Sequence, residues 1–251
     1  MSNNTKNLLV IGIVFGVLMI AAPVTMTISA YTSVKLTLLD NAGVMIESKG
    51  LRIYVDPYLL PEEYENKPAD VVCVTHPHGD HYNILDINLI QKEDTINIFP
   101  ANMSDAVALF DGVGVNPGVE VVISDTITIT AFYMYTFSLE GYDATHPAEN
   151  NWTSYIIDIN GFVIFHAGDS KNIPEYEQLT GRIDVAMLPL GPGCQTMFEM
   201  EVVDAINTIQ PDYMVPLHFQ EPANDIFYNT YGVLFQATTY VGLDHFQSYR
   251  F

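Results

Sequence analysis

The stretch that decides the fold is residues 70–81, which read Asp-Val-Val-Cys-Val-Thr-His-Pro-His-Gly-Asp-His. Its first part, residues 70–75, is a continuous apolar run of the kind that forms a strand buried on both faces of a sheet. His76 and His78 follow directly and are two residues apart, so in extended chain they point to the same side. The predicted strand therefore carries two imidazoles at its carboxyl end.

The last residues of this stretch add two more metal donors. Gly79 lets the backbone turn, so that Asp80 and His81 aim at a point beside the first two histidines. Three imidazoles crowded together without a metal would repel one another when protonated, which disfavours the alternative of a surface histidine cluster. One loop is thus predicted to serve two adjacent metal ions.

Strands alternate with short helices on both sides of this stretch. Further strands are predicted over residues 34–39, 44–47, 51–55, 96–99, 119–123, 127–135, 154–159, 162–165, 185–188 and 213–216. Apolar residues at helical spacing predict a helix over residues 198–209, which ends before Pro211. This order indicates layers of sheet enclosed by helices.

The first 30 residues differ from the rest of the chain. Lys6 precedes an apolar stretch, and the small residue Ala30 offers a cleavage site for an export signal. A cleaved signal and a retained membrane anchor over residues 8–28 are both open, because the stretch is long enough for either. Either alternative predicts that the folded domain over residues 31–251 lies outside the cytoplasm, secreted or anchored to the cell membrane.

The charge of the chain excludes one class of partner. Its 251 residues contain 9 Lys and Arg against 30 Asp and Glu, a formal net charge of -21, and this repels nucleic-acid backbones. The two cysteines, Cys73 and Cys194, form no Cys-x-x-Cys pair, so nitrogen and oxygen are the expected metal donors. Cys73 is expected to be a small buried hydrophobe, whereas Cys194 lies in a Gly-Pro-Gly loop and has no assigned role.

The pattern His-x-His-x-Asp-His after a buried strand resembles the signature of the metallo-β-lactamase superfamily. Asp56-Pro57, Ala167-Gly168-Asp169-Ser170 and Pro216-Leu217-His218-Phe219 look like later motifs of that family. The likeness covers roughly residues 34 to 220. The sequence of residues 146–152 is similar to sequences of the branch of ascorbate-phosphate lactonase-like hydrolases. The resemblance implies an α/β (α+β) fold, a four-layer αββα sandwich with a dinuclear metal site at one edge of the sheets.

The resemblance also implies the ligands. One ion would be held by His76, His78 and His146, the other by Asp80, His81 and His218, with Asp169 bridging the two. Open alternatives are a turn-capping loop histidine at His146, a turn aspartate at Asp169 and a partly buried histidine at His218. His166 is expected to support the site or to pack, and residues 40–42 lack the Gly-His that relatives commonly have.

Imidazole and carboxylate donors suit two Zn²⁺ ions, although Mn²⁺ or iron would accept the same set. Two bridged ions lower the pKa of a shared water to about 7 or below, which provides a hydroxide nucleophile at neutral pH. Asp80 would orient that hydroxide and take a proton, which makes Asp80 the expected catalytic residue. Iron oxygen reductases of the superfamily usually replace the second histidine with glutamate, so His78 favours hydrolysis.

The predicted function is the metal-dependent hydrolysis of a small ester, lactone or phosphoester. One alternative is a membrane-associated, phospholipase-like hydrolase, in which aromatic residues between 132 and 142 line an apolar cleft. Another is a non-catalytic metal-binding or interaction protein on the same fold. Lys171 is either the nearest cation for an anionic substrate or a solvated surface lysine. The oligomeric state is left open.

Overall fold

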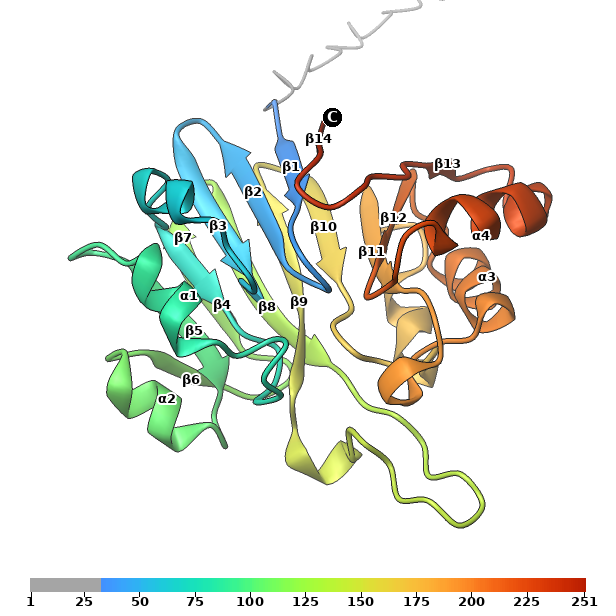
Figure 1. The fold of residues 1–251 in the computed structure, drawn as a ribbon, viewed down its shortest axis with the longest axis horizontal. Helices are drawn as coiled ribbons and strands as arrows, with labels where there is room; N and C mark the ends of the chain where they lie inside the picture. Colours follow the sequence, from blue (N-terminus) through green and yellow to red (C-terminus); the bar gives the residue numbers. More distant parts are fainter. Residues whose placement is uncertain (1–32) are drawn as a thin grey trace, which may run out of the picture. The chain divides into compact units, whose positions relative to one another are not determined.

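Two β-sheets of seven strands each form the centre of the structure, a computed structural model that describes residues 33–251 (Figure 1). The first sheet has the spatial order β14 (Ser248–Arg250), β1 (Lys35–Leu38), β2 (Val44–Ser48), β3 (Leu51–Val55), β4 (Val71–Cys73), β5 (Ile96–Pro100) and β6 (Val113–Val115). The second has the order β13 (Thr239–Tyr240), β12 (Tyr213–Leu217), β11 (Val185–Pro189), β10 (Phe162–His166), β9 (Thr153–Ile159), β8 (Ile127–Tyr133) and β7 (Glu120–Ser124). The four neighbouring strands β3, β4, β5 and β6 of the first sheet are parallel to one another, and so are β10, β11, β12 and β13 of the second. All other neighbouring pairs are antiparallel.

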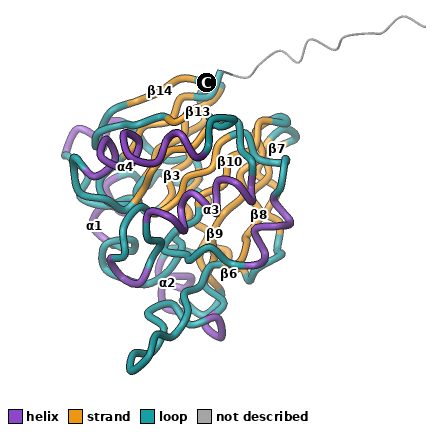
Figure 2. The backbone as a smooth tube through the Cα atoms, turned by 90° about the vertical axis from the view of Figure 1, so that its right-hand side faces the viewer, coloured by secondary structure: helices purple, strands orange, loops and turns teal. Residues whose placement is uncertain are grey.

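Helices cover the outer side of each sheet. The α-helices are α1 (Ile84–Leu89), α2 (Ser104–Leu109), α3 (Glu199–Ile209) and α4 (Ala223–Tyr231). The 3₁₀ helices are η1 (Glu62–Asn66), η2 (Ala148–Asn150), η3 (Pro174–Leu179), η4 (Gly193–Gln195) and η5 (Gly232–Leu234). α1 and α2 lie beside the first sheet and α3 and α4 beside the second, and Figure 2 shows α3 in front of the strands (Figures 1 and 2). The predicted four-layer αββα sandwich is therefore confirmed.

Apolar side chains fill the layer between the sheets. Val44 and Ile46 of the first sheet and Ile157 of the second are fully buried in one large cluster. A second cluster lies on the other face of the first sheet, where Phe99 packs with Ile87 of α1. Strand β4 is thus buried on both faces of the first sheet, as the apolar run at residues 70–75 predicts.

Helix α3 follows from its sequence in detail. Val202, Ile206 and Ile209 are buried on one face, at the spacing of an amphipathic helix. The Glu201 carboxylate accepts a hydrogen bond from the Phe198 N–H at 2.8 Å, which satisfies a free donor at the helix start. The predicted helix boundaries agree with this element to within one residue.

The predicted strands are present with small shifts in their ends, and the largest shift is in β4. This strand ends at Cys73 because the Thr75 N–H leaves the ladder and donates to Asp56 Oδ1 at 2.7 Å. The sequence analysis did not predict β6, β13 and β14, nor α1, α2 and α4. β14 pairs antiparallel with β1 from the other end of the chain, with Tyr249 opposite Leu36.

The parallel halves of the two sheets position the site. Loops that follow the carboxyl ends of β3, β4, β10 and β12 carry Asp56, His76, Asp169 and His218, respectively. Ligand sites in parallel sheets form at the carboxyl ends of strands, where loops from neighbouring strands meet.

The predicted extracytoplasmic location needs correction. Its basis, the signal or anchor at residues 1–30 with its apolar stretch 8–28, lies outside the described residues. Among residues 33–251, no helix is long and apolar enough to cross a membrane. The location that the sequence analysis predicted is therefore not retained.

Candidate metal centre

The histidine loop links β4 directly to α1. The backbone N–H groups of His81 and Tyr82 donate to the His78 carbonyl at 3.0 and 2.8 Å, which closes the turn around Gly79. The Asn83 side chain then accepts backbone N–H groups of the first turn of α1. The candidate metal ligands of this loop, from His76 to His81, are therefore held in a short connection that backbone hydrogen bonds fix.

Asp169 reaches the site through a turn that requires glycine. Gly168 has φ +55°, and a Cβ there would lie 2.7 Å from Met134 Sδ and 3.1 Å from Thr75 Cβ. The turn between β10 and Asp169 thus packs against the strand end that precedes His76. This close approach places the carboxylate next to the histidine loop.

His146 and His218 come from two other loops. The His146 N–H donates to Thr136 Oγ1 at 3.1 Å, and the Thr136 N–H donates to the His146 carbonyl at 2.8 Å. The His218 N–H donates to the Asn41 carbonyl at 3.0 Å, which connects the loop after β12 to the turn after β1. Both histidines are therefore fixed through their own backbone.

The structure brings all seven candidate ligands together. The ligand atoms in each of two groups lie within 4.8 Å of one another: His76, His78 and His146, and Asp80, His81 and His218. The Asp169 carboxylate lies 3.2 Å from His81 Nε2, 3.3 Å from His218 Nε2 and 3.5 Å from His146 Nε2. Asp169 is thus in reach of both groups, which have the same members as the two implied ligand sets.

Hydrogen bonds orient the imidazoles of the first group. Thr75 Oγ1 donates to Asp56 Oδ2 at 2.6 Å and therefore accepts from His76 Nδ1 at 2.9 Å. In the same way, Thr145 Oγ1 donates to the Cys194 carbonyl and therefore accepts a hydrogen bond from His146 Nδ1 at 3.0 Å. The protons are thus on Nδ1, and Nε2 of each ring presents a lone pair to the site.

His81 is oriented by a carboxylate. Its Nδ1 donates to Asp56 Oδ2 at 2.8 Å, and both side chains are fully buried. Asp56 therefore supports His81 directly and His76 through Thr75. A carboxylate behind an imidazole is a common support for histidine ligands of metals.

Several buried polar atoms of the described residues lack a hydrogen-bond partner. In residues 33–251, neither oxygen of Asp169 has a hydrogen-bond partner, nor does Nε2 of His81 or of His218. Asp169 is fully buried. His76 Nε2 and His146 Nε2, both lone-pair nitrogens, are 3.2 Å apart. Such an arrangement is costly without a cation, because it combines an unpaired buried carboxylate with facing lone pairs. The donor set therefore fits metal ions.

The pKa values divide the histidines into two kinds. Burial lowers the pKa of His76 well below its usual value, that of His78 below its usual value, and that of His146 to about 4. Burial also opposes the charge on His81 and His218, but carboxylates outweigh it. The negative charges of Asp169 and Asp56 raise the pKa of His81 to about 10, and the nearby carboxylates of Asp169 and Asp80 raise the pKa of His218 to about 12.

Asp80 is a ligand candidate that is partly open to solvent. Its side chain is 36% exposed, and its Oδ2 accepts from Asn41 Nδ2 at 3.1 Å. His218, whose Nε2 lies 3.7 Å from Asp80 Oδ2, lowers the pKa of Asp80, so this carboxylate is ionised near neutral pH. Asn41 lies in the turn after β1 and orients Asp80 from there.

Two candidate residues lie outside the ligand groups. His166 is buried and lies 2.8 Å from the Ala42 carbonyl, to which its Nε2 donates. It therefore supports the turn before Gly43, as expected for a residue that is not a ligand. Lys171 is neither a solvated lysine nor a free cation, because it is buried and pairs with Glu201 at 2.6 Å.

Sequence reasoning missed most of the supporting residues. Thr75 and Thr145 each precede a histidine ligand candidate, and this adjacency was the available signal. Asp56 was noticed only as part of a motif. Asn41 and Trp152 carried no signal of their role, because their partners are far away in the chain.

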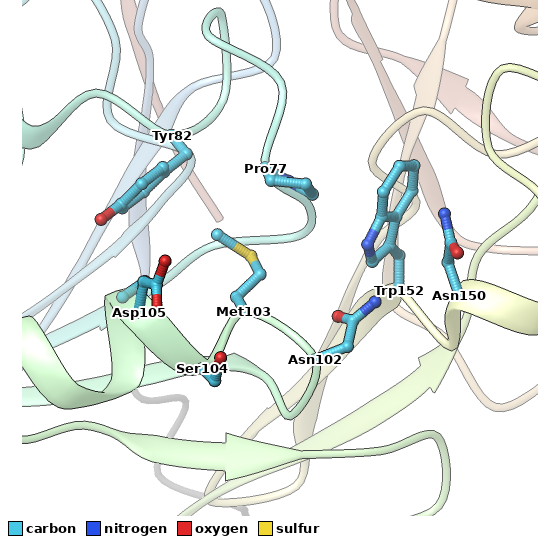
Figure 3. A pocket seen from close by; sticks show the side chains of 9 residues that line it. Pro77, Tyr82, Asn102, Met103, Ser104, Asp105, Asn150 and Trp152 are labelled. Carbon is cyan, nitrogen blue, oxygen red and sulfur yellow. The ribbon is translucent and has the colours of Figure 1, made fainter.

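A cavity of about 460 Å³ lies beside the first histidine group (Figure 3). Pro77, between His76 and His78, lines it together with Trp152, whose ring centroid is 5.5 Å from that of His76. Other lining residues shown in Figure 3 are Tyr82, Asn102, Met103, Ser104, Asp105 and Asn150. A second cavity of about 540 Å³ borders Asp80 on the other side of the site. In the described part of the chain, neither cavity has a lysine or arginine in its lining.

This combination of an αββα sandwich and a histidine–aspartate cluster at the strand ends defines a metallo-β-lactamase-type fold with a candidate dinuclear site. Residues 35–218 match the family model of the beta-lactamase superfamily domain, and the chain belongs to that family. The resemblance found in the sequence is thus confirmed at the level of the superfamily.

Relatives of similar length come from archaea. The chain is 31% identical over 204 residues to a UPF0173 metal-dependent hydrolase of Thermococcus kodakarensis, an alignment that covers 74% of this chain and 84% of the relative. It is 29% identical over 189 residues to a UPF0173 protein of Pyrococcus abyssi, covering 74% and 83%. Among solved structures, Igni18, a metallo hydrolase of Ignicoccus hospitalis, superposes with a TM-score of 0.74 at 20% identity and covers 88% of this chain and 99% of its own.

Proposed function

We propose that this protein is a metal-dependent hydrolase with a dinuclear centre. His76, His78 and His146 would hold one ion, Asp80, His81 and His218 the other, and Asp169 would bridge them. The observation that carries the proposal is the buried Asp169 carboxylate, which lacks a hydrogen-bond partner among residues 33–251 although imidazoles approach it within 3.2 to 3.5 Å. The names of the UPF0173 relatives support the same class of activity.

The donors favour zinc as the resident metal. Five imidazoles and two carboxylates are borderline to hard donors, which suit Zn²⁺ and accept Mn²⁺ or iron. When bound, such ions lower the pKa of water to about 7 and polarise the bond to be cleaved.

The residues of the chain divide the remaining work. Asp80 is ionised, partly exposed and fixed by Asn41, so it is placed to orient a water molecule and to accept its proton. Asp56 and Thr145 hold the imidazoles from behind, so the site needs little rearrangement during turnover. Trp152 and Pro77 screen one flank of the first histidine group from water.

The cavities favour an uncharged substrate. Small esters, lactones and phosphoesters all fit the chemistry, and the metal ions would bind the scissile group of each, but any further negative charge on a phosphoester needs a cation from the protein. Lys171 pairs with Glu201, and the lining of the cavity in Figure 3 contains the acid Asp105. A neutral ester or lactone is therefore the preferred substrate class.

Metal analysis combined with a substrate panel tests this function. The purified protein is expected to contain two zinc or similar ions per chain and to hydrolyse neutral aryl esters or lactones faster than bis(aryl) phosphodiesters. His78→Ala should abolish hydrolysis, whereas Asp125→Asn, at an exposed position far along the chain, should leave it unchanged. Full metal content without turnover on the whole panel would indicate a metal-binding protein, and absence of metal would leave only a scaffold.

A further inference from the structure

Cys194 lies next to the candidate metal centre. It belongs to the loop between β11 and α3, and its thiol sulfur is within 4.8 Å of a ligand atom of Asp169 and of one of His218. The residue is exposed and forms no disulfide. The other cysteine, Cys73, is fully buried in β4. Of the two thiols in the chain, one therefore faces the centre.

Contacts to a neighbouring loop hold Cys194 in this position. Its carbonyl accepts from Thr145 Oγ1 at 2.5 Å, the same hydroxyl that orients His146. The adjacent Gln195 accepts from the Thr145 N–H at 3.0 Å and donates to the Asp143 carbonyl at 3.0 Å. The loop that carries the thiol is thus tied to the loop that carries a histidine of the first group.

The atoms that the thiol faces are themselves without partners. Both oxygens of the fully buried Asp169 and Nε2 of His218 lack hydrogen-bond partners within residues 33–251. The ligand atoms of a carboxylate, an imidazole and a thiol therefore lie within 4.8 Å of one another. This donor combination is common in zinc sites and absent from sites built for hard cations.

We propose that Cys194 is an additional ligand of the ion on the Asp169–His218 side of the centre. The inference rests on the proposed dinuclear centre and extends its ligand set to sulfur. On metal binding, the S–H bond breaks, the proton passes to the buffer, and the thiolate electron pair forms the bond to the metal. The thiolate makes this position selective for Zn²⁺, Co²⁺ or Fe²⁺ over Mn²⁺. The expectation that only nitrogen and oxygen bind metal is then incomplete.

Cobalt titration of the full chain tests the ligand directly. Addition of Co²⁺ to ion-free protein should produce a near-ultraviolet thiolate-to-cobalt charge-transfer band, in addition to visible ligand-field bands. Cys194→Ser should lose the charge-transfer band and keep the visible bands. Cys73→Ala is the matched control for the other thiol and should keep both sets of bands.

A second measurement uses the unmodified chain and so does not depend on a variant that folds. Reaction of the native protein with a thiol-specific disulfide reagent should modify one cysteine per chain, and zinc should slow this reaction about tenfold or more.

Cys194→Ser should also reduce the preference for Zn²⁺ over Mn²⁺ by roughly tenfold.

The outcomes separate this inference from the proposed function. Two bound ions with no charge-transfer band and no protection of the thiol would overturn the role of Cys194 and leave the dinuclear centre intact. Failure of the chain to bind Co²⁺ or Zn²⁺ would overturn the centre and the ligand together. A band that persists in Cys194→Ser would also contradict the proposal.

Discussion

The two halves of the candidate centre differ in charge and in exposure. In the half with His76, His78 and His146, burial lowers the pKa of every imidazole, and the aromatic ring of Trp152 lies within 5.7 Å of all three ring centroids. In the half with Asp80, His81 and His218, carboxylates raise the pKa of both imidazoles, and Asp80 is open to solvent.

This difference suggests a division of labour. Neutral imidazoles with fixed lone pairs bind a cation without first losing protons, so the first half is suited to hold its ion tightly. Protonated imidazoles next to carboxylates must exchange protons for metal, and the exposed Asp80 gives water access to the second half. We therefore propose that the first half anchors the centre and that the second half carries out proton transfer.

The largest expected effect comes from the residue that both halves share. Asp169→Asn keeps the size of the side chain and removes the bridging charge. Hydrolysis should fall by roughly 10³-fold or more, and bound metal should fall from two ions to one or fewer per chain. Metal analysis and ester hydrolysis measure both effects, with Asp125→Asn as the control at an exposed acid. Retention of two ions in the variant would contradict the bridging role.

Supporting residues should separate the halves by metal affinity. Thr145→Ala removes the acceptor for His146 and the hydrogen bond to the Cys194 carbonyl, so it should weaken zinc binding to the first half by roughly 10- to 100-fold and to the second half by less. Asp56→Asn should weaken the binding of zinc to both halves, because Asp56 supports His81 directly and His76 through Thr75. Competitive titration with zinc measures the affinity of each half for its ion.

The control for these variants is Thr230→Ala. Thr230 is exposed and its hydroxyl donates to a helix carbonyl, so its loss should not change either zinc affinity. Equal weakening of zinc binding to both halves by Thr145→Ala would show that the halves are not independent.

Asn41→Ala should affect turnover more than metal binding. It removes the hydrogen bond to Asp80 Oδ2 and leaves every candidate ligand in place. The kcat value should fall by about 10-fold, with zinc content unchanged, because Asp80 loses its fixed orientation. Steady-state kinetics at full zinc loading are the measurement. Loss of zinc with an unchanged kcat per bound ion would assign Asn41 to metal retention instead.

The smallest effect concerns pH. A raised pKa means that His81 and His218 keep their protons at neutral pH in the ion-free protein, so zinc must displace them and binds more tightly as pH rises. A lowered pKa means that His76 and His146 are already neutral, so the first half should show little pH dependence above about pH 6.5. Between about pH 6.5 and about pH 8, zinc titrations should show an affinity of the first half that does not change with pH and an affinity of the second half that rises with pH. Two flat affinities would contradict the difference between the halves.

Local sequence patterns were sufficient for much of the fold. The apolar run before His76 and the spacing in α3 each reflect burial that a local pattern encodes. β14 was not predicted because its stability comes from pairing with β1, more than 200 positions away, and its own residues are exposed. α1 and α2 have six residues each, which is too short for a helical period to be recognised.

The site divides in a similar way. Ligand candidates in one loop were visible because their spacing is local, and His146, Asp169 and His218 were assigned through the family resemblance. Asn41 and Cys194 could not be found, because their relation to the centre exists only after the loops fold together. The buried pairing of Lys171 with Glu201 likewise spans 30 positions of the chain.

The most direct test of the central claim is anomalous diffraction at the zinc edge from crystals of the zinc-loaded protein. The account predicts two peaks, one among His76, His78 and His146 and the other among Asp80, His81 and His218, on either side of Asp169. A zinc-loaded crystal with no peak between these side chains would contradict it.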